Sequence, residues 1–236
     1  IVSNRDVASP FLTSIQENAV KPIEPVFLDF KKDMSQLTAK SDIPVLYKQN
    51  TTNDLFQLIY VFDMGNNNDK ALGTAFDYLE YLGTSDMTPE ELKSEFYRLA
   101  CTFYVSPGNE RTYVVLSGLN ENMPAAMQLF EKLLADAQVN KEAYNNLVGD
   151  ILKARADAKL NQGQNFSRLM NYAMYGPKSP ATNLLTEAEL ASMNPQKLVD
   201  RIHNQNNYKH RILYYGPSSS KDLLATIEQY LSLIHI

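Results

Sequence analysis

The chain has 236 residues, of which 44% are hydrophobic and 21% are charged. This is ordinary globular composition, and it suffices for one large domain or for one domain with a connecting segment. The net charge is −5 and the 22 Lys and Arg residues form no run or stripe, so we expect no nucleic-acid partner. No apolar stretch approaches the roughly 20 residues that span a bilayer, so no membrane partner is expected.

Residues 1–40 differ in pattern from the rest of the chain. Pro10, Pro22 and Pro25 punctuate short apolar pieces, and FLDFKKDMSQL follows without a clear long period. We interpret this stretch as a connector with one short helix, leading into a domain near Ser41. The start, IVSNRDVASP, lacks the basic-then-apolar pattern of a signal peptide and begins without Met. The sequence therefore indicates no compartment, and we expect a piece of a longer chain.

The domain begins with two strand-like runs, IPVLYKQN and LFQLIYVFDMG, which the turn-forming group TTND separates. In the second run Phe56, Leu58, Tyr60 and Phe62 alternate with residues that are also mostly apolar. Both faces of this run are therefore largely apolar, which predicts a central strand covered on at least one side.

A helix is predicted over about 69–82, and its two sides differ in polarity. Leu72, Phe76 and Leu79 recur at helical spacing and are expected to pack on the sheet. The opposite side, expected to be polar surface or the wall of a substrate chamber, carries Thr74, Asp77, Tyr78 and Tyr81. Gly83-Thr84 ends this helix, and Thr88-Pro-Glu-Glu91 forms a capping box that starts the next.

The remaining elements follow in a regular order. ACTFYVSP and RTYVVLSGL are strands joined by the hairpin turn PGNE. Helices are predicted at about 123–136, 140–160, 165–175, 187–192 and 195–204, followed by the strand KHRILYYG and a helix after Pro217-Ser218. Short turns between paired strands favour antiparallel pairing, so we predict an α+β fold with a largely antiparallel sheet covered by helices.

Few residues suggest chemistry. Cys101, the single cysteine, lies in an apolar run and is predicted to be a buried strand residue. The three histidines, His203, His210 and His235, have no carboxylate phrase around them and are expected at the surface. Asp150 and Asp157 lie two turns apart on one helix, a spacing typical of a solvated face.

The element order and several phrases resemble one repeat of the insulinase/pitrilysin family of zinc metallopeptidases, which is related to the processing peptidases. In that family H-x-x-E-H on the catalytic helix is followed by Gly-Thr, and a later helix supplies a Glu as the third zinc ligand. When Gly83-Thr84 is matched to that pair, Thr74-Ala75-Phe76-Asp77-Tyr78 aligns with H-x-x-E-H. Asp150, 72 residues after Tyr78, then aligns with the third ligand. MNYAMYGPKSPATNLLTEAEL and the residues after it resemble the family's closing segment. The resemblance covers about 41–232 and rests on the order of many weak motifs.

The aligned residues do not carry the family's chemistry. A catalytic zinc there needs two imidazoles one turn apart and a carboxylate, with a Glu that activates water. Thr74 and Tyr78 are poor zinc ligands, and Asp77 and Asp150 without imidazoles suit at most a weakly held hard cation. We therefore predict no metal site, no cofactor and no catalytic residues in this chain, with Thr74, Asp77, Tyr78 and Asp150 as degenerate positions.

The resemblance implies a non-catalytic, third-domain-like repeat that supplies substrate-chamber wall and closure. Residues 1–40 would connect it to a preceding half, 41–232 would be the inactive domain, and 233–236 a tail. The N-terminal half of the same polypeptide would hold zinc and cut the peptide substrate, while this chain alone would be inactive. Two alternatives are a stand-alone, non-enzymatic binding or scaffold member of the same fold, and an independent hydrolase that uses Asp77 and Asp150.

Overall fold

A computed structural model describes residues 8–180, 182–205 and 208–230 of the chain. The chain divides into two units, Ile1–Asp33 and Met34–Ile236. The first contains two short helices, α1 (Pro10–Gln16) and α2 (Phe30–Asp33). Ser9 caps α1 by accepting a hydrogen bond from the backbone N–H of Leu12, with Pro10 at the first helical position.

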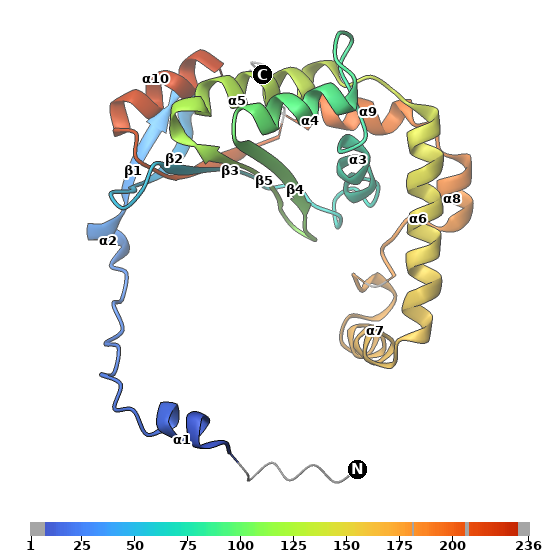
Figure 1. Ribbon diagram of the computed structural model, residues 1–236. Helices are drawn as coiled ribbons and strands as arrows, with labels where there is room; N and C mark the ends of the chain where they lie inside the picture. The colour runs from blue at the N-terminus through green and yellow to red at the C-terminus, as the bar shows by residue number, and fades with distance from the viewer. Residues whose placement is uncertain (1–7, 181, 206–207, 231–236) are drawn as a thin grey trace. The chain divides into compact units, whose positions relative to one another are not determined.

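The second unit is built on a six-stranded sheet with the order β1-β2-β6-β3-β5-β4 (Figure 1). Every neighbouring pair is antiparallel except β2 and β6, which are parallel. The largely antiparallel sheet of the predicted α+β fold is therefore confirmed. The strands are β1 (Ser35–Ala39), β2 (Ile43–Gln49), β3 (Leu55–Phe62), β4 (Cys101–Pro107), β5 (Thr112–Leu119) and β6 (His210–Gly216).

Eight α-helices of the second unit are described, and the long ones agree with the predicted ranges within a few residues. Both Thr88 on α4 and Thr186 on α8 form capping boxes, because each hydroxyl accepts from the N3 backbone while the N3 Glu bonds back. The helices are α3 (Leu72–Leu79), α4 (Pro89–Arg98), α5 (Met123–Asp136), α6 (Lys141–Leu160), α7 (Gln162–Tyr175), α8 (Glu187–Ser192), α9 (Gln196–His203) and α10 (Ser220–Tyr230). Among the described residues, no helix combines the length and the apolarity needed to cross a membrane.

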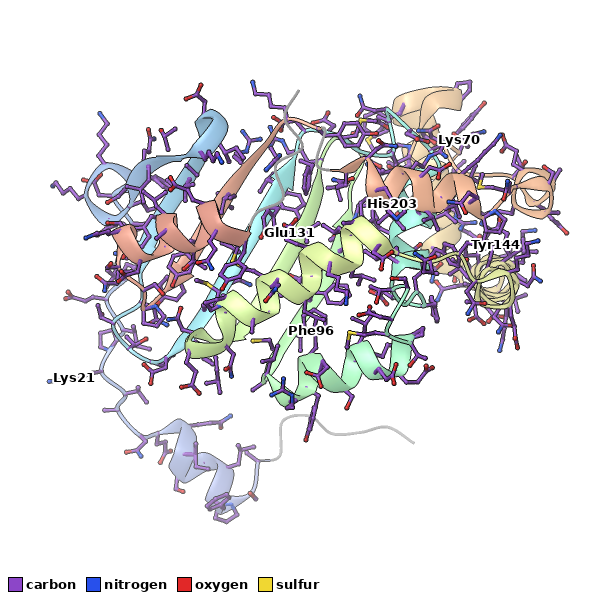
Figure 2. The ribbon with its side chains drawn as sticks, turned by 90° about the horizontal axis from the view of Figure 1, so that it is seen from above. Lys21, Lys70, Phe96, Glu131, Tyr144 and His203 are labelled. Carbon is purple, nitrogen blue, oxygen red and sulfur yellow. The ribbon has the colours of Figure 1, made fainter. Side chains whose placement is uncertain are left out.

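One face of the sheet is covered by helices and holds the core. Figure 2, seen from above, shows α5 lying across the strands, with α4 beside it. Phe103 of β4 lies between Phe96 of α4 and Phe130 of α5, with ring centroids 5.0 Å apart in both pairs. The buried alternate residues of β3, Phe56, Leu58, Tyr60 and Phe62, point to this covered face. Their burial confirms the central position predicted for the strand.

The opposite face of the sheet, which we call the open face, is only partly buried. Leu55, Tyr104, Tyr113 and Tyr215 belong to it and are 38–51% exposed. The strand register places Ile59 of β3 between Val115 of β5 and Leu213 of β6, so the face is apolar at its centre. The described helices therefore leave Leu55 and three tyrosines of the open face accessible, while Val61 and Val115 on the same face are buried.

Two features of the sheet differ from the sequence-based prediction. β2 and β3 do not pair with each other across TTND, because β6 inserts between them. β6 suits this central position since Ile212 and Tyr214 are buried on the covered face while Leu213 is partly buried on the other. In addition, Ser35–Ala39 forms a strand paired with β2, although residues 1–40 were expected to be a connector. The pairing partner, and not any strong pattern of its own, makes this stretch a strand.

Candidate functional site

The helix that resembles a metal-binding helix, α3, is anchored at its start by polar side chains of the preceding loop. Asp69 accepts from the backbone N–H of Ala71 at 3.0 Å, and Asn66 accepts from that of Gly73 at 3.0 Å. Asp69 is also ion-paired with Arg201 of α9, Nε to Oδ2 at 2.6 Å. The start of α3 is therefore fixed to α9, and the orientation of its faces follows from that anchor.

Tyr78, at the position that resembles the second histidine, is fully buried. Its hydroxyl donates to the carbonyl oxygen of Asn140 at 2.6 Å and accepts from the backbone N–H of the same residue at 2.8 Å. Its ring packs edge to face against the ring of Tyr144, with the ring centroids 5.7 Å apart. Tyr144 lies on α6, which Figure 2 shows end-on. Burial raises the pKa of Tyr78, so the hydroxyl stays protonated. The prediction that Tyr78 lies on a polar side of α3 is wrong, because this side chain links α3 to the start of α6.

The other residues of the predicted polar side are accessible. Thr74 is half-buried, and Asp77 and Tyr81 are exposed. The surroundings still partly desolvate the Asp77 carboxyl, and this burial together with nearby Glu80 raises its pKa. Asp77 forms no ion pair with any described residue and lies near a second carboxylate, so it offers a weak acid and no assembled catalytic group.

Asp150 and Asp157 are both exposed on α6, as expected for a solvated face. Within residues 8–180, 182–205 and 208–230, no three His, Cys, Asp or Glu side chains gather closely enough to hold a metal ion. The zinc that the family resemblance implies therefore does not fit the residues present at the aligned positions. The assignment of Thr74, Asp77, Tyr78 and Asp150 as degenerate positions stays a prediction.

Gly83-Thr84, the pair on which the resemblance is anchored, forms a tight connection between α3 and α4. A Cβ at Gly83 would lie 2.3 Å from the carbonyl oxygen of Met87, so the close backbone approach requires glycine. Thr84 is buried, its backbone N–H donates to the Met87 carbonyl at 2.9 Å, and its hydroxyl donates to Asp86 at 2.8 Å. The pair is thus explained by local geometry without any metal.

The isolated thiol and histidines have structural environments. Cys101 is buried, as predicted, and burial raises the pKa of its thiol. His203 is half-buried, with Nε2 3.2 Å from the Ala137 carbonyl oxygen. The expected surface position of His210 is wrong: it is buried against Phe62 at 5.0 Å, and burial lowers its pKa. His235 lies outside the described residues.

Two hollows of similar size are lined by none of the predicted positions Thr74, Asp77, Tyr78 and Asp150. An apolar one of about 680 Å³ is lined by Leu82, Leu92, Phe96 and other residues of α3, α4, α5 and β4. A more polar one of about 670 Å³ lies between the β4–β5 turn and α7 and is lined by Asn67, Gly108, Asn109, Glu110, Arg111, Tyr113, Asn171, Tyr175 and Pro180. Sequence reasoning missed both, because each joins segments that are far apart in the chain.

Comparisons with known proteins identify the fold. No family model and no curated protein matches the sequence. The periplasmic protease PqqL from Escherichia coli has a TM-score of 0.71 and 14% identity, over 98% of this chain and 29% of that chain. A peptidase M16 inactive domain from Pseudomonas fluorescens has a TM-score of 0.71 and 15% identity, over 84% of this chain and 50% of that chain. A protease from Helicobacter pylori has a TM-score of 0.66 and 12% identity, over 85% of this chain and 50% of that chain.

These similar structures extend well beyond the present chain, which spans 29–50% of their lengths. At 12–15% identity the likeness concerns the fold. The fold supports the family resemblance, since a six-stranded sheet packed by helices occurs in M16-type neighbours that include an inactive domain. The chain therefore has an α+β fold like that of M16-type peptidase domains.

Proposed function

We propose that this chain is a non-catalytic domain of an insulinase/pitrilysin-type zinc metalloendopeptidase. In this proposal it contributes wall and closure to a substrate chamber, and the N-terminal half of the same polypeptide holds zinc and cuts the peptide. The observation that carries the proposal is the burial and hydrogen bonding of Tyr78 on α3. Tyr78, aligned with a zinc-binding histidine, is buried and doubly hydrogen-bonded to Asn140, so the helix serves as scaffold.

The open face of the sheet supports the role of chamber wall. Tyr104, Tyr113 and Tyr215 leave 38–50% of their surface accessible on three different strands. Tyrosine rings bind apolar groups through their faces and polar groups through the hydroxyl, so they suit peptides of varied sequence. Exposed aromatic rings on a sheet face are costly in a separate domain, whereas inside a closed chamber they would contact substrate.

The reading frame that encodes this chain gives the most direct test. The proposal expects an H-x-x-E-H upstream, followed by a Glu at a spacing similar to the 72 residues between Tyr78 and Asp150. A frame that starts just before Ile1, or that lacks the motif, would contradict it. The 236-residue chain alone should show neither stoichiometric zinc nor peptide hydrolysis. Hydrolysis that Asp150→Ala abolishes would instead support the independent hydrolase.

A stand-alone binding or scaffold protein of the same fold is the second candidate. The exposed apolar residues on α7, among them Phe166 and Leu169, favour it, because they suit binding without chemistry. Isolation of the protein from its native source separates the candidates. A polypeptide about twice this length or longer supports the first proposal, in line with neighbours of which this chain covers 29–50%.

A further inference from the structure

Exposed methionine is concentrated on helix α7. Of the eight methionines in the chain, Met170 and Met174 are 43% and 60% exposed. Met123 and Met127 on α5 are buried in the core, at 1% and 0%. The remaining four are half-buried: Met34, Met64, Met87 and Met193. Among the described residues, α7 therefore offers the thioethers that a dissolved reagent reaches most easily.

The two methionines share one side of α7 with an aromatic ring. Phe166, Met170 and Met174 follow at intervals of four residues, so they form a stripe along the helix, which we call the α7 stripe. Phe166 is 63% exposed, and no residue of α7 is buried. Figure 1 shows α7 beside the end of α6 that is farther from α5. The described residues therefore leave the α7 stripe open to water.

Peroxides oxidise an accessible thioether to a sulfoxide. With hydrogen peroxide, the sulfur lone pair attacks one oxygen, so that an S–O bond forms as the O–O bond breaks. The second oxygen leaves as water after proton transfer, and the sulfur has lost two electrons to the peroxide. The product is polar where methionine was apolar, and methionine sulfoxide reductases reverse the reaction.

The consequence of oxidation depends on where the methionine lies. A sulfoxide at Met123 or Met127 would place a polar S–O group in the core, which destabilises the fold. At Met170 and Met174 the S–O group stays in water, so the cost to the fold is small. The change is then confined to the α7 stripe, which becomes more polar.

We propose that Met170 and Met174 form a site of reversible oxidation by peroxide, at which the sulfoxides reduce the apolarity of the α7 stripe while the chain stays folded. The site would make the affinity of this surface for apolar groups depend on the peroxide to which the protein is exposed. The inference goes beyond the proposed function, and it holds whether the chain belongs to a peptidase or to a stand-alone protein.

Mass spectrometry of the 236-residue chain during exposure to hydrogen peroxide tests the proposal. The same chain unfolded in urea, where every methionine is accessible, gives the reference rate for each position. We expect Met170 and Met174 to react within about threefold of their rates in urea, and Met123 and Met127 at least about tenfold more slowly than in urea. Protection of Met170 and Met174 equal to that of Met123 and Met127 would overturn the proposal.

Two measurements follow the chain once Met170 and Met174 have reacted. Thermal unfolding should give a Tm within about 2 °C of that of the untreated chain, and hydrophobic-interaction chromatography should show weaker retention. Met170→Leu with Met174→Leu keeps the stripe apolar but removes both sulfurs, so the same exposure should leave its retention unchanged. Met64→Leu with Met193→Leu is the matched control and should lose retention as the unchanged chain does. An oxidised chain that unfolds, or a Met170→Leu, Met174→Leu variant that still loses retention, would contradict the proposal.

Protein from its native source shows whether the site is accessible in the complete polypeptide. After exposure to peroxide it should carry sulfoxide at Met170 and Met174, and a methionine sulfoxide reductase should remove it. Protection of both residues there by another domain or a partner would overturn the inference and leave the proposed function unaffected. The reading frame tests the proposed function separately, because an upstream H-x-x-E-H has no bearing on these two thioethers.

Discussion

The link between α3 and α6 can be tested by removing one oxygen atom. Tyr78→Phe keeps the buried ring and its edge-to-face contact with Tyr144 but removes the hydroxyl that donates to and accepts from Asn140. Both hydrogen bonds are lost together, at 2.6 Å and 2.8 Å. We expect a folded protein of lower stability, because the backbone at the start of α6 loses its partner.

The size of the loss follows from the exposure of the two partners. A typical intramolecular hydrogen bond contributes about 0.5–1.5 kcal/mol, so two give about 1–3 kcal/mol. Asn140 is exposed, and water can replace the hydroxyl at its N–H and carbonyl, which places the expected loss at about 1–2 kcal/mol. For a chain of this size each kcal/mol lowers Tm by about 2–4 °C, so Tm should fall by about 2–8 °C.

Thermal unfolding followed by circular dichroism measures this change. Tyr81→Phe is the matched control, because Tyr81 is 41% exposed on the same segment and its loss of a hydroxyl should change stability by less than about 0.5 kcal/mol. If Tyr78→Phe melts at the same temperature as Tyr81→Phe and the unchanged chain, the hydroxyl does not hold the two helices together. The scaffold role assigned to α3 would then lose its physical basis.

Three further predictions concern other parts of the fold. Burial lowers the pKa of His210 in the folded chain, so the unfolded chain binds a proton at higher pH than the folded chain does. The free energy of unfolding should therefore fall as pH drops below about 6.5. In urea titrations at several pH values, His210→Phe should show a weaker dependence on pH than the unchanged chain. Gly83→Ala should destabilise the fold by about 1–3 kcal/mol, because the new Cβ would meet the Met87 carbonyl oxygen. Gly149→Ala on α6, where a Cβ would meet no other atom, should stabilise it by about 0.5–1 kcal/mol. An unchanged stability of Gly83→Ala would refute the close approach. Cys101 should react with a thiol reagent only after unfolding, and rapid labelling of the native chain would show that it is accessible.

The sequence determined the elements of the fold because local signals are strong there. The alternation in β3 and the capping box at Thr88 each depend on neighbours within a few residues. The hairpin of β4 and β5 was also predictable, because the short PGNE turn leaves antiparallel pairing as the simplest arrangement. These signals sufficed for an α+β fold with a largely antiparallel sheet.

The order of strands was decided only by the tertiary structure. Asn50 ends β2 with its backbone N–H bonded to Gly216 of β6, a residue far away in the sequence. Pairing between distant strands depends on which apolar edge is available after the helices pack, and no short stretch of sequence encodes it. For the same reason Ser35–Ala39 became a strand only beside β2.

The sequence alone also fixed which residue types stand on α3, and hence that Thr74, Asp77 and Tyr78 do not form a pair of imidazoles with a carboxylate. It could not fix where these side chains point. Tyrosine is amphipathic, so helical periodicity allows Tyr78 on either side of the helix, and only the tertiary structure shows it buried beside Asn140 and Tyr144. Helix α7 is the converse case, since it carries many large apolar side chains but none of its residues is buried.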